Sequence, residues 1–176
     1  MKIKIHSIES IITRAMLPFE PKTILISIGD TGAQPPNLLN KPDYILRLNF
    51  DDITLEEAKS ELWMPPSVTS LEEKVKEGIE KKIEEEVARH LRSCNIELFN
   101  DEQAKLIAEF VFRHIRDTDV LICQCHYGQS RSAGCAAAIM EYFNGNGIDI
   151  FADERFYPNR YVYHKMMKAL EECEQE

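Results

Sequence analysis

Short apolar runs, each followed by a polar loop, recur along the chain. Residues 2–5 (KIKI) alternate between charged and apolar side chains, and residues 23–28 (TILISI) are rich in β-branched and apolar side chains. Residues 44–48 (YILRL) and 119–123 (DVLIC) have a similar character. Runs of this length and composition predict strands. The last run is the most apolar, so we expect its strand to be the most buried of the four.

Longer segments with helical signals lie between or after these runs. Asn100 as a capping residue, followed by early acidic residues, predicts a helix over residues 100–116. Residues 132–140 are small and apolar, as in a helix that lies against a sheet, and a last helix is expected over residues 158–170. The alternation of strand, loop and helix predicts an α/β fold. We expect a single three-layer domain over residues 1–176, with a central, mainly parallel sheet flanked by helices.

The segment from residue 54 to residue 97 differs from the rest of the chain by its high charge. Pro65 and Pro66 break a first short helix, and apolar residues then recur at a four-residue spacing. They are Leu71, Val75, Ile79, Ile83, Val87 and Leu91. This spacing predicts one long amphipathic helix packed on the core, within a helical insertion, and it lacks the sustained heptads of a coiled coil. Trp63 and the two prolines form a candidate lid tip; the alternative is an aromatic side chain packed on the core.

Composition and charge exclude several classes of function. The 176 residues are 44% hydrophobic and 29% charged, which is typical of one globular domain. A net charge of −9 disfavours nucleic acid and anionic membrane surfaces as partners. No apolar run is long enough to span a bilayer, so a cytoplasmic protein is expected. The five cysteines are odd in number and lack the spacing of a metal site, so reduced thiols and no bound metal are expected.

One stretch carries candidate chemistry: residues 123–132, with the sequence CQCHYGQSRS, directly after the last predicted strand. In folds of this class, ligands bind at the carboxyl ends of strands where a helix begins. Successive backbone N–H groups in a tight loop, followed by a helix N-terminus, converge on a phosphate, and Gly128 allows a positive φ and a close approach. The candidate phosphate-binding residues are His126, Tyr127, Gly128, Gln129, Ser130 and Arg131.

The same stretch combines a nucleophile with groups that would stabilise negative charge. Arg131 offers a planar fork to two phosphate oxygens. This positive environment is expected to stabilise a thiolate at Cys125, to which Ser132 would donate a hydrogen bond. The alternative is that Cys125 is an inert small apolar residue at a strand end. For Cys123 and Cys135 a packing role is expected.

The pattern C-x-x-G-x-x-R-S over residues 125–132 resembles the signature loop of the cysteine-dependent protein tyrosine and dual-specificity phosphatases, including the bacterial-type predicted protein tyrosine phosphatases. The resemblance extends beyond the loop. Residues 45–52 are similar to the strand that carries the general-acid aspartate of this family. Residues 101–115 and 158–163 are similar to its helix before the signature strand and to its closing helix.

The resemblance implies a phosphatase-like fold and hydrolysis of a phosphomonoester through a cysteinyl-phosphate intermediate. Cys125 would attack in line, and Arg131 with the loop amides would bind the equatorial oxygens. Alignment on the family makes Asp52 the general acid, whereas Asp51 is the other candidate and is expected to cap the next helix. No metal or other cofactor is implied. The expected substrate and partner is a phosphorylated protein, phosphotyrosine first, with dual specificity left open.

One departure from the family pattern keeps other functions open. The family usually has histidine before its nucleophile, whereas this chain has Gln124. The main alternative is therefore a catalytically weak or inactive phosphate-binding module, a pseudophosphatase. A thiol-redox sensor built on Cys123, Cys125 and Cys135 is a further alternative. The sequence does not indicate the oligomeric state.

Overall fold

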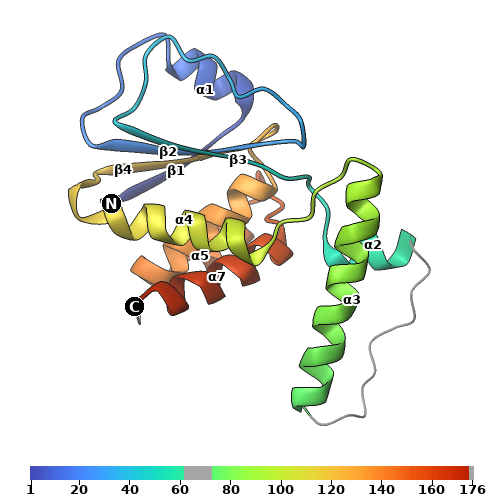
Figure 1. Ribbon diagram of the computed structural model, residues 1–176. Helices are drawn as coiled ribbons and strands as arrows, with labels where there is room; N and C mark the ends of the chain where they lie inside the picture. The colour runs from blue at the N-terminus through green and yellow to red at the C-terminus, as the bar shows by residue number, and fades with distance from the viewer. Residues whose placement is uncertain (62–72, 175–176) are drawn as a thin grey trace.

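The computed structural model of the chain describes residues 1–61 and 73–174, and its centre is a four-stranded sheet (Figure 1). The strand order is β1-β4-β2-β3, and all three strand pairs are parallel. The strands are β1 (Lys2–His6), β2 (Thr23–Gly29), β3 (Tyr44–Asn49) and β4 (Val120–Gln124). The prediction of an α/β domain with a mainly parallel sheet is confirmed, and the four predicted strands are all present.

Helices cover both faces of the sheet, so the domain has three layers (Figure 1). One short helix, α1 (Ile8–Arg14), lies on one face, where Ile11 packs against Leu25 and Ile122. The opposite face is covered by α4 (Asp101–His114), α5 (Arg131–Asn144) and α7 (Arg160–Glu174). The short helix α6 (Ile148–Ala152) and a 3-10 turn (Ile115–Asp117) were not predicted.

Local sequence explains where the main helices begin and end. Asn100 and Gln103 form a capping box at the start of α4, in which each side chain accepts from the backbone N–H of the other. Gly145 ends α5 with a φ of 68°, a left-handed conformation that glycine adopts without strain. The two helices flank β4 in the sequence, and both pack on the same face of the sheet.

The strand β4 lies inside the sheet, between β1 and β2, and all five of its residues are buried. Cys123 pairs with Ile5 of β1 and with Ile26 of β2. Because all four strands are parallel, their carboxyl ends meet at one edge of the sheet. The loops that follow the four strands therefore lie together at that edge, and they supply the candidate site.

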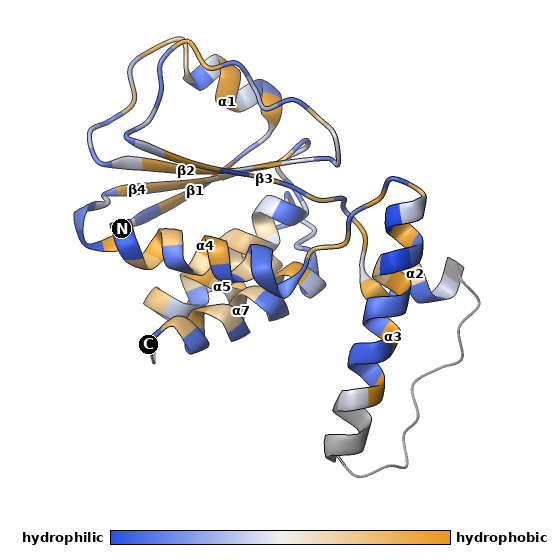
Figure 2. Cartoon of the chain, in the orientation of Figure 1, coloured by the Kyte–Doolittle hydropathy of each residue, from blue (hydrophilic) through white to orange (hydrophobic). Residues whose placement is uncertain are grey.

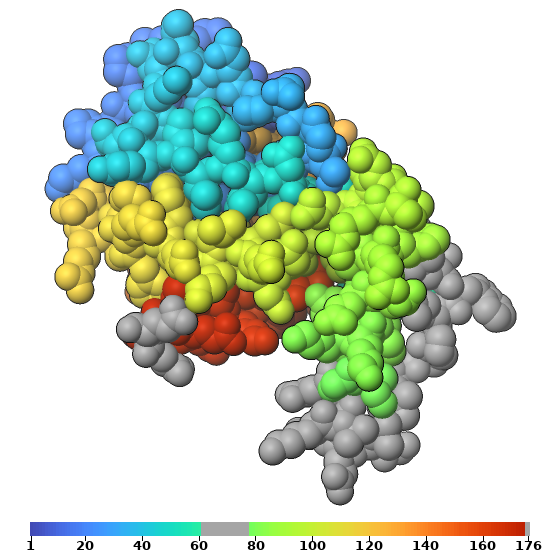
Figure 3. Space-filling model, in the orientation of Figure 1, coloured from blue at the N-terminus to red at the C-terminus, as the bar shows by residue number. Residues whose placement is uncertain are grey.

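The insertion forms a helical arm that Figure 3 shows projecting from the rest of the protein. It contains α2 (Leu55–Glu61) and α3 (Glu73–Ser93), and Figure 2 shows that α3 is mostly hydrophilic with a narrow apolar stripe. In the described part of that stripe, Val87 and Leu91 are buried against Ala58 of α2 and Leu98. The prediction that this helix packs on the core is wrong, because these residues form an apolar cluster separate from that of the sheet. The predicted helix break at Pro65 and Pro66 and the candidate lid tip at Trp63 lie outside the described residues. Among the residues that are described, none of the helices has both the length and the apolar character needed to cross a membrane.

Candidate active site

The candidate site is the loop between β4 and α5, which is attached to the end of β1. The N–H of Cys125 donates to the carbonyl of His6 at 3.3 Å, and the carbonyl of His126 accepts from the N–H of Ile8 at 3.1 Å. Gly128 has a φ of 70°. A Cβ at this position would lie 2.6 Å from the N of Ser7 and 2.7 Å from the carbonyl carbon of His6. Glycine is therefore required here both for the left-handed backbone and for the close approach of two chain segments.

The backbone N–H groups of the loop are left available for a ligand. Within the described part of the chain, the six N–H groups of residues 126–131 donate to no protein acceptor. The loop carbonyls are bound instead: the carbonyl of Gln129 accepts from Tyr157 N–H at 2.9 Å, and that of Ser130 accepts from Asn159 N–H at 3.2 Å. A run of free donors ahead of a helix N-terminus forms a concave site for an anion.

Arg131, the first residue of α5, is buried beneath this loop with 3% of its side chain exposed. One terminal nitrogen donates to the carbonyls of Phe50 at 2.6 Å and Gly29 at 3.2 Å, and the other forms an ion pair with Asp30 at 2.6 Å. Its Nε has no hydrogen-bond partner among the described residues. A buried charged donor without an acceptor is costly unless a ligand supplies one.

Cys125 and Ser132 meet at the base of the loop. The sulfur of Cys125 and the hydroxyl of Ser132 are 3.0 Å apart, and both side chains are buried. With Cys125 ionised, the Ser132 hydroxyl would be the donor of this hydrogen bond. The predicted nucleophile and its predicted hydrogen-bond donor are therefore in contact.

The two candidate general acids have different surroundings. The carboxylate of Asp51 accepts from the N–H of Glu97 at 2.8 Å and from the hydroxyl and N–H of Thr31 at 2.5 and 3.3 Å. Asp52 is exposed and faces the loop, where its Oδ1 accepts from the hydroxyl of Ser130 at 2.6 Å and from the amide of Asn159 at 3.0 Å. Asp52 is the one that contacts the loop that follows β4. Asp51 was expected to cap α2, but that role belongs to Thr54 and Glu57, which form a reciprocal pair of hydrogen bonds.

The outer residues of the loop differ in how they are held. His126 and Tyr127 are exposed and lie edge to face, with ring centroids 4.5 Å apart. His126 is also 3.9 Å from the carboxylate of Asp30. The side chain of Gln129 is exposed, and Ser130 is half-buried with its hydroxyl on Asp52. Of the predicted phosphate-binding residues, Gly128, Ser130 and Arg131 are thus fixed by contacts with other elements.

Gln124, at the end of β4, is fully buried on the side of the sheet away from Cys125. Its Oε1 accepts from the hydroxyl of Ser27 at 2.7 Å, and its Nε2 has no partner among the described residues. It borders a cavity of about 30 Å³ together with Asp30 and His126. Gln124 therefore links the ends of β4 and β2 inside the protein.

The other two buried cysteines belong to the apolar core. The sulfurs of Cys123 and Cys135 are 4.0 Å apart, and both side chains are fully buried. The contact with the Cys135 thiol and burial together raise the pKa of the Cys123 thiol well above its ordinary value. A neutral, buried thiol fits the packing role predicted for this residue.

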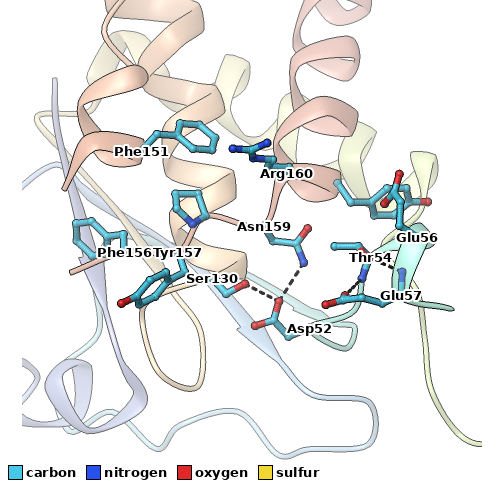
Figure 4. Close-up of a pocket in the computed structure, with 12 residues that line it drawn as sticks. Asp52, Thr54, Glu56, Glu57, Ser130, Phe151, Phe156, Tyr157, Asn159 and Arg160 are labelled. Carbon is cyan, nitrogen blue, oxygen red and sulfur yellow. Dashed lines mark hydrogen bonds between the residues drawn. The ribbon is translucent and has the colours of Figure 1, made fainter. Parts of the chain in front are cut away.

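A cleft of about 590 Å³ opens beside the loop on the side of Asp52 (Figure 4). Asp52 and Ser130 line the cleft next to the loop, and the segment from Phe156 to Tyr161 lines another part of it. The remaining lining residues are Thr54, Glu56, Glu57 and Phe151. The cleft thus joins the insertion to the loop before α7.

Two residues of the site were missed by the sequence analysis. Asp30 follows β2 and holds Arg131, and Asn159 holds Asp52 while its Oδ1 accepts from the N–H of Val162 at the start of α7. Asp30 comes directly after a predicted buried strand, and this position lies at the same edge of the sheet as Cys125. Its place in the sequence could therefore have identified it as a site residue. Residues 1–61 and 73–174 contain no group of three or more His, Cys, Asp or Glu side chains arranged to hold a metal ion.

Comparisons of the chain with protein-family models, with curated proteins and with solved structures found no match.

Proposed function

We propose that the protein hydrolyses a phosphomonoester of a phosphoprotein, phosphotyrosine first and with dual specificity left open, through a cysteinyl-phosphate intermediate. The observation that carries this proposal is the buried Arg131, whose Nε has no partner among the described residues, at the end of a loop with free backbone N–H groups that begins at Cys125. A phosphate dianion would satisfy these donors together, because its equatorial oxygens accept from both guanidinium and amide N–H groups.

The chemistry would proceed in two displacements. The Cys125 thiolate attacks phosphorus, the bond to the leaving oxygen breaks, and protonated Asp52 gives its proton to that oxygen. Asp52, now a carboxylate, takes a proton from water, which attacks phosphorus, breaks the P–S bond and releases inorganic phosphate. Ser132 stabilises the thiolate when it departs, since its hydroxyl is 3.0 Å from the sulfur.

The test uses a nitroaryl phosphate with a metal chelator present, and compares the wild type with Cys125→Ser. Turnover by the wild type that is abolished in the variant supports the proposal. A second readout is alkylation of thiols, because inorganic phosphate should protect Cys125 while Cys94, which is exposed, serves as the internal control. Equal labelling of both residues regardless of phosphate would contradict a phosphate site at Cys125.

A second candidate function is a phosphate-binding module without turnover. The observation in its favour is Gln124, the residue before Cys125: its Oε1 accepts from Ser27 of β2, and among the described residues it forms no hydrogen bond with the Cys125 sulfur. This function requires that phosphate protects Cys125 from alkylation while no aryl phosphate is hydrolysed. The two functions thus share the protection result and differ in turnover.

A further inference from the structure

The cleft beside Asp52 lies on the side of the loop where a leaving group must sit. A general acid protonates the leaving oxygen, so the group attached to that oxygen lies on the same side of the phosphate as the acid. Asp52 contacts the loop through Ser130, and both residues line the cleft. At about 590 Å³, the cleft has room for more than one side chain of a peptide.

The two ends of the cleft differ in chemistry (Figure 4). Phe156 and Tyr157 lie on one side of Asp52, and Tyr157 is 73% exposed although its N–H is fixed to the carbonyl of Gln129. Glu56 and Glu57 lie on the other side, at the start of α2. The aromatic end offers a rigid face to an aryl group, and the acidic end offers carboxylates to a cation.

Charge favours a cation at the acidic end. The ionisable side chains of the lining, tyrosines aside, are three carboxylates, Asp52, Glu56 and Glu57, and one guanidinium, that of Arg160. Figure 4 places Arg160 beside Phe151, at the opposite rim of the cleft from Asp52. Arg160 and Phe151 also line a neighbouring cavity. The carboxylate of Glu57 is occupied by the N–H of Thr54, whereas Glu56 is exposed and makes no hydrogen bond or ion pair with another described residue.

We propose that this cleft selects a phosphotyrosyl peptide with a lysine or arginine next to the phosphotyrosine, a specificity that rests on the proposed function. The ring of the phosphotyrosine lies against Tyr157, and the basic neighbour reaches Glu56. Glu56 is thus a specificity-determining residue supplied by the insertion, and Tyr157 is its counterpart on the loop before α7.

The experiment measures binding rather than turnover, so that it does not depend on catalysis. Cys125→Ser protein is titrated with labelled phosphotyrosyl peptides that carry lysine, alanine or glutamate beside the phosphotyrosine, and with their unphosphorylated forms. The lysine peptide should bind about two- to fivefold more tightly than the alanine peptide, as expected for one exposed ion pair. Glu56→Gln should remove this preference.

Two variants serve as matched controls. Glu85→Gln removes the same charge from the insertion at an exposed position of α3 outside the cleft, so it should leave the preference unchanged. Tyr157→Ala should weaken all phosphotyrosyl peptides, whereas Tyr44→Ala, which removes an exposed tyrosine of β3 that is not part of the cleft lining, should not.

The outcomes separate this inference from the proposed function. Binding without a basic preference, a glutamate preference lost in Arg160→Ala, or a lysine preference that survives Glu56→Gln would each overturn the inference and leave the phosphatase proposal standing. If the Cys125→Ser variant binds the lysine peptide selectively but the wild type hydrolyses no phosphate ester, the proposed hydrolysis is refuted and the proposed peptide preference is supported. Failure of every phosphopeptide to bind would overturn both.

Discussion

Asp51 and Asp52 are neighbours in sequence, but the structure predicts opposite consequences of replacing each by asparagine. Asp51 is half-buried and its carboxylate accepts three hydrogen bonds, from Glu97 and from two groups of Thr31. Asp52 is exposed and accepts two, from Ser130 and Asn159. Asp51→Asn should therefore affect stability, and Asp52→Asn should affect the chemical step.

The size of each effect follows from these contacts. Asparagine at position 51 has one acceptor oxygen, and its NH₂ group points toward other donors. Either the two hydrogen bonds of Oδ2, with Thr31 and Glu97, or the one hydrogen bond of Oδ1, with Thr31, are therefore lost. Hydrogen bonds to charged groups contribute about 1.5–3 kcal/mol each, so a loss of about 2–3 kcal/mol is expected in this half-buried setting. For a domain of this size, that lowers Tm by about 4–12 °C. Water can replace the partners of Asp52, so Asp52→Asn should change stability by less than about 1 kcal/mol.

The assay combines urea denaturation with turnover of two substrates. Asp52→Asn should slow hydrolysis of a tyrosyl or alkyl phosphate by about 10²- to 10⁴-fold, the usual contribution of a general acid. A nitroaryl phosphate should be slowed much less, because its leaving group needs no proton, and the alkaline limb of the pH–rate profile should flatten. If Asp51→Asn gave this leaving-group dependence at unchanged stability, the assignment from the structure would be wrong. If neither variant gave it, the acid would lie elsewhere.

Three further predictions concern the loop and the ion pair between α4 and α7. Gly128→Ala should lower the free energy of unfolding by more than the roughly 1–2 kcal/mol cost of a left-handed alanine, and should abolish phosphate protection in alkylation, because the added Cβ meets the backbone at 2.6 Å. Asp30→Asn should weaken phosphate protection of the Cys125 thiol about tenfold, because Arg131 loses its ion pair; unchanged protection would mean that the backbone carbonyls alone hold the guanidinium. Burial raises the pKa of Asp101, but the hydrogen bond and charge of Lys165 outweigh burial and hold that pKa below its ordinary value of 3.8. This stabilisation is present above pH 3.8 and lost as the pH falls through the lowered pKa, so the stability difference between wild type and Lys165→Met, measured by urea denaturation, should shrink in acid.

The fold and the loop were predictable because their signals are local. The strand β4 is an apolar run, Gly128 is followed three residues later by Arg131, and Asn100 starts α4 with a capping box. Each of these features is settled by residues that are close in sequence. The short helix α6 was not predicted because five residues are too few to show a helical period.

The partners of the site residues were not predictable in the same way. Asp30 is separated from Arg131 by 101 positions and Asn159 from Asp52 by 107, so each pairing depends on how the strand ends meet. The alternation of side chains could not decide between Asp51 and Asp52 either, because β3 ends at Asn49 and the chain has left the sheet before both residues. Their directions are set by the contacts with Glu97 and Ser130, which only the folded chain provides.

Asp51 also explains how the sheet accommodates the insertion. The N–H of Asp51 donates to the carbonyl of Glu97 at 2.8 Å, and the N–H of Glu97 donates to the Asp51 carboxylate at 2.8 Å. The two ends of the arm are therefore joined at one point. The chain connects β3 to α4 as it would if a short loop replaced the arm. A long insertion costs little in stability when its ends are held together in this way. Because Asp52 is the next residue, this pair of hydrogen bonds also fixes the backbone beside the candidate acid, whose carboxylate accepts from Ser130. Loss of the Asp51 carboxylate would weaken this pair of hydrogen bonds. Asp51 thus fixes the point at which the arm is attached, and Asp52, the next residue, is thereby held at the edge of the loop.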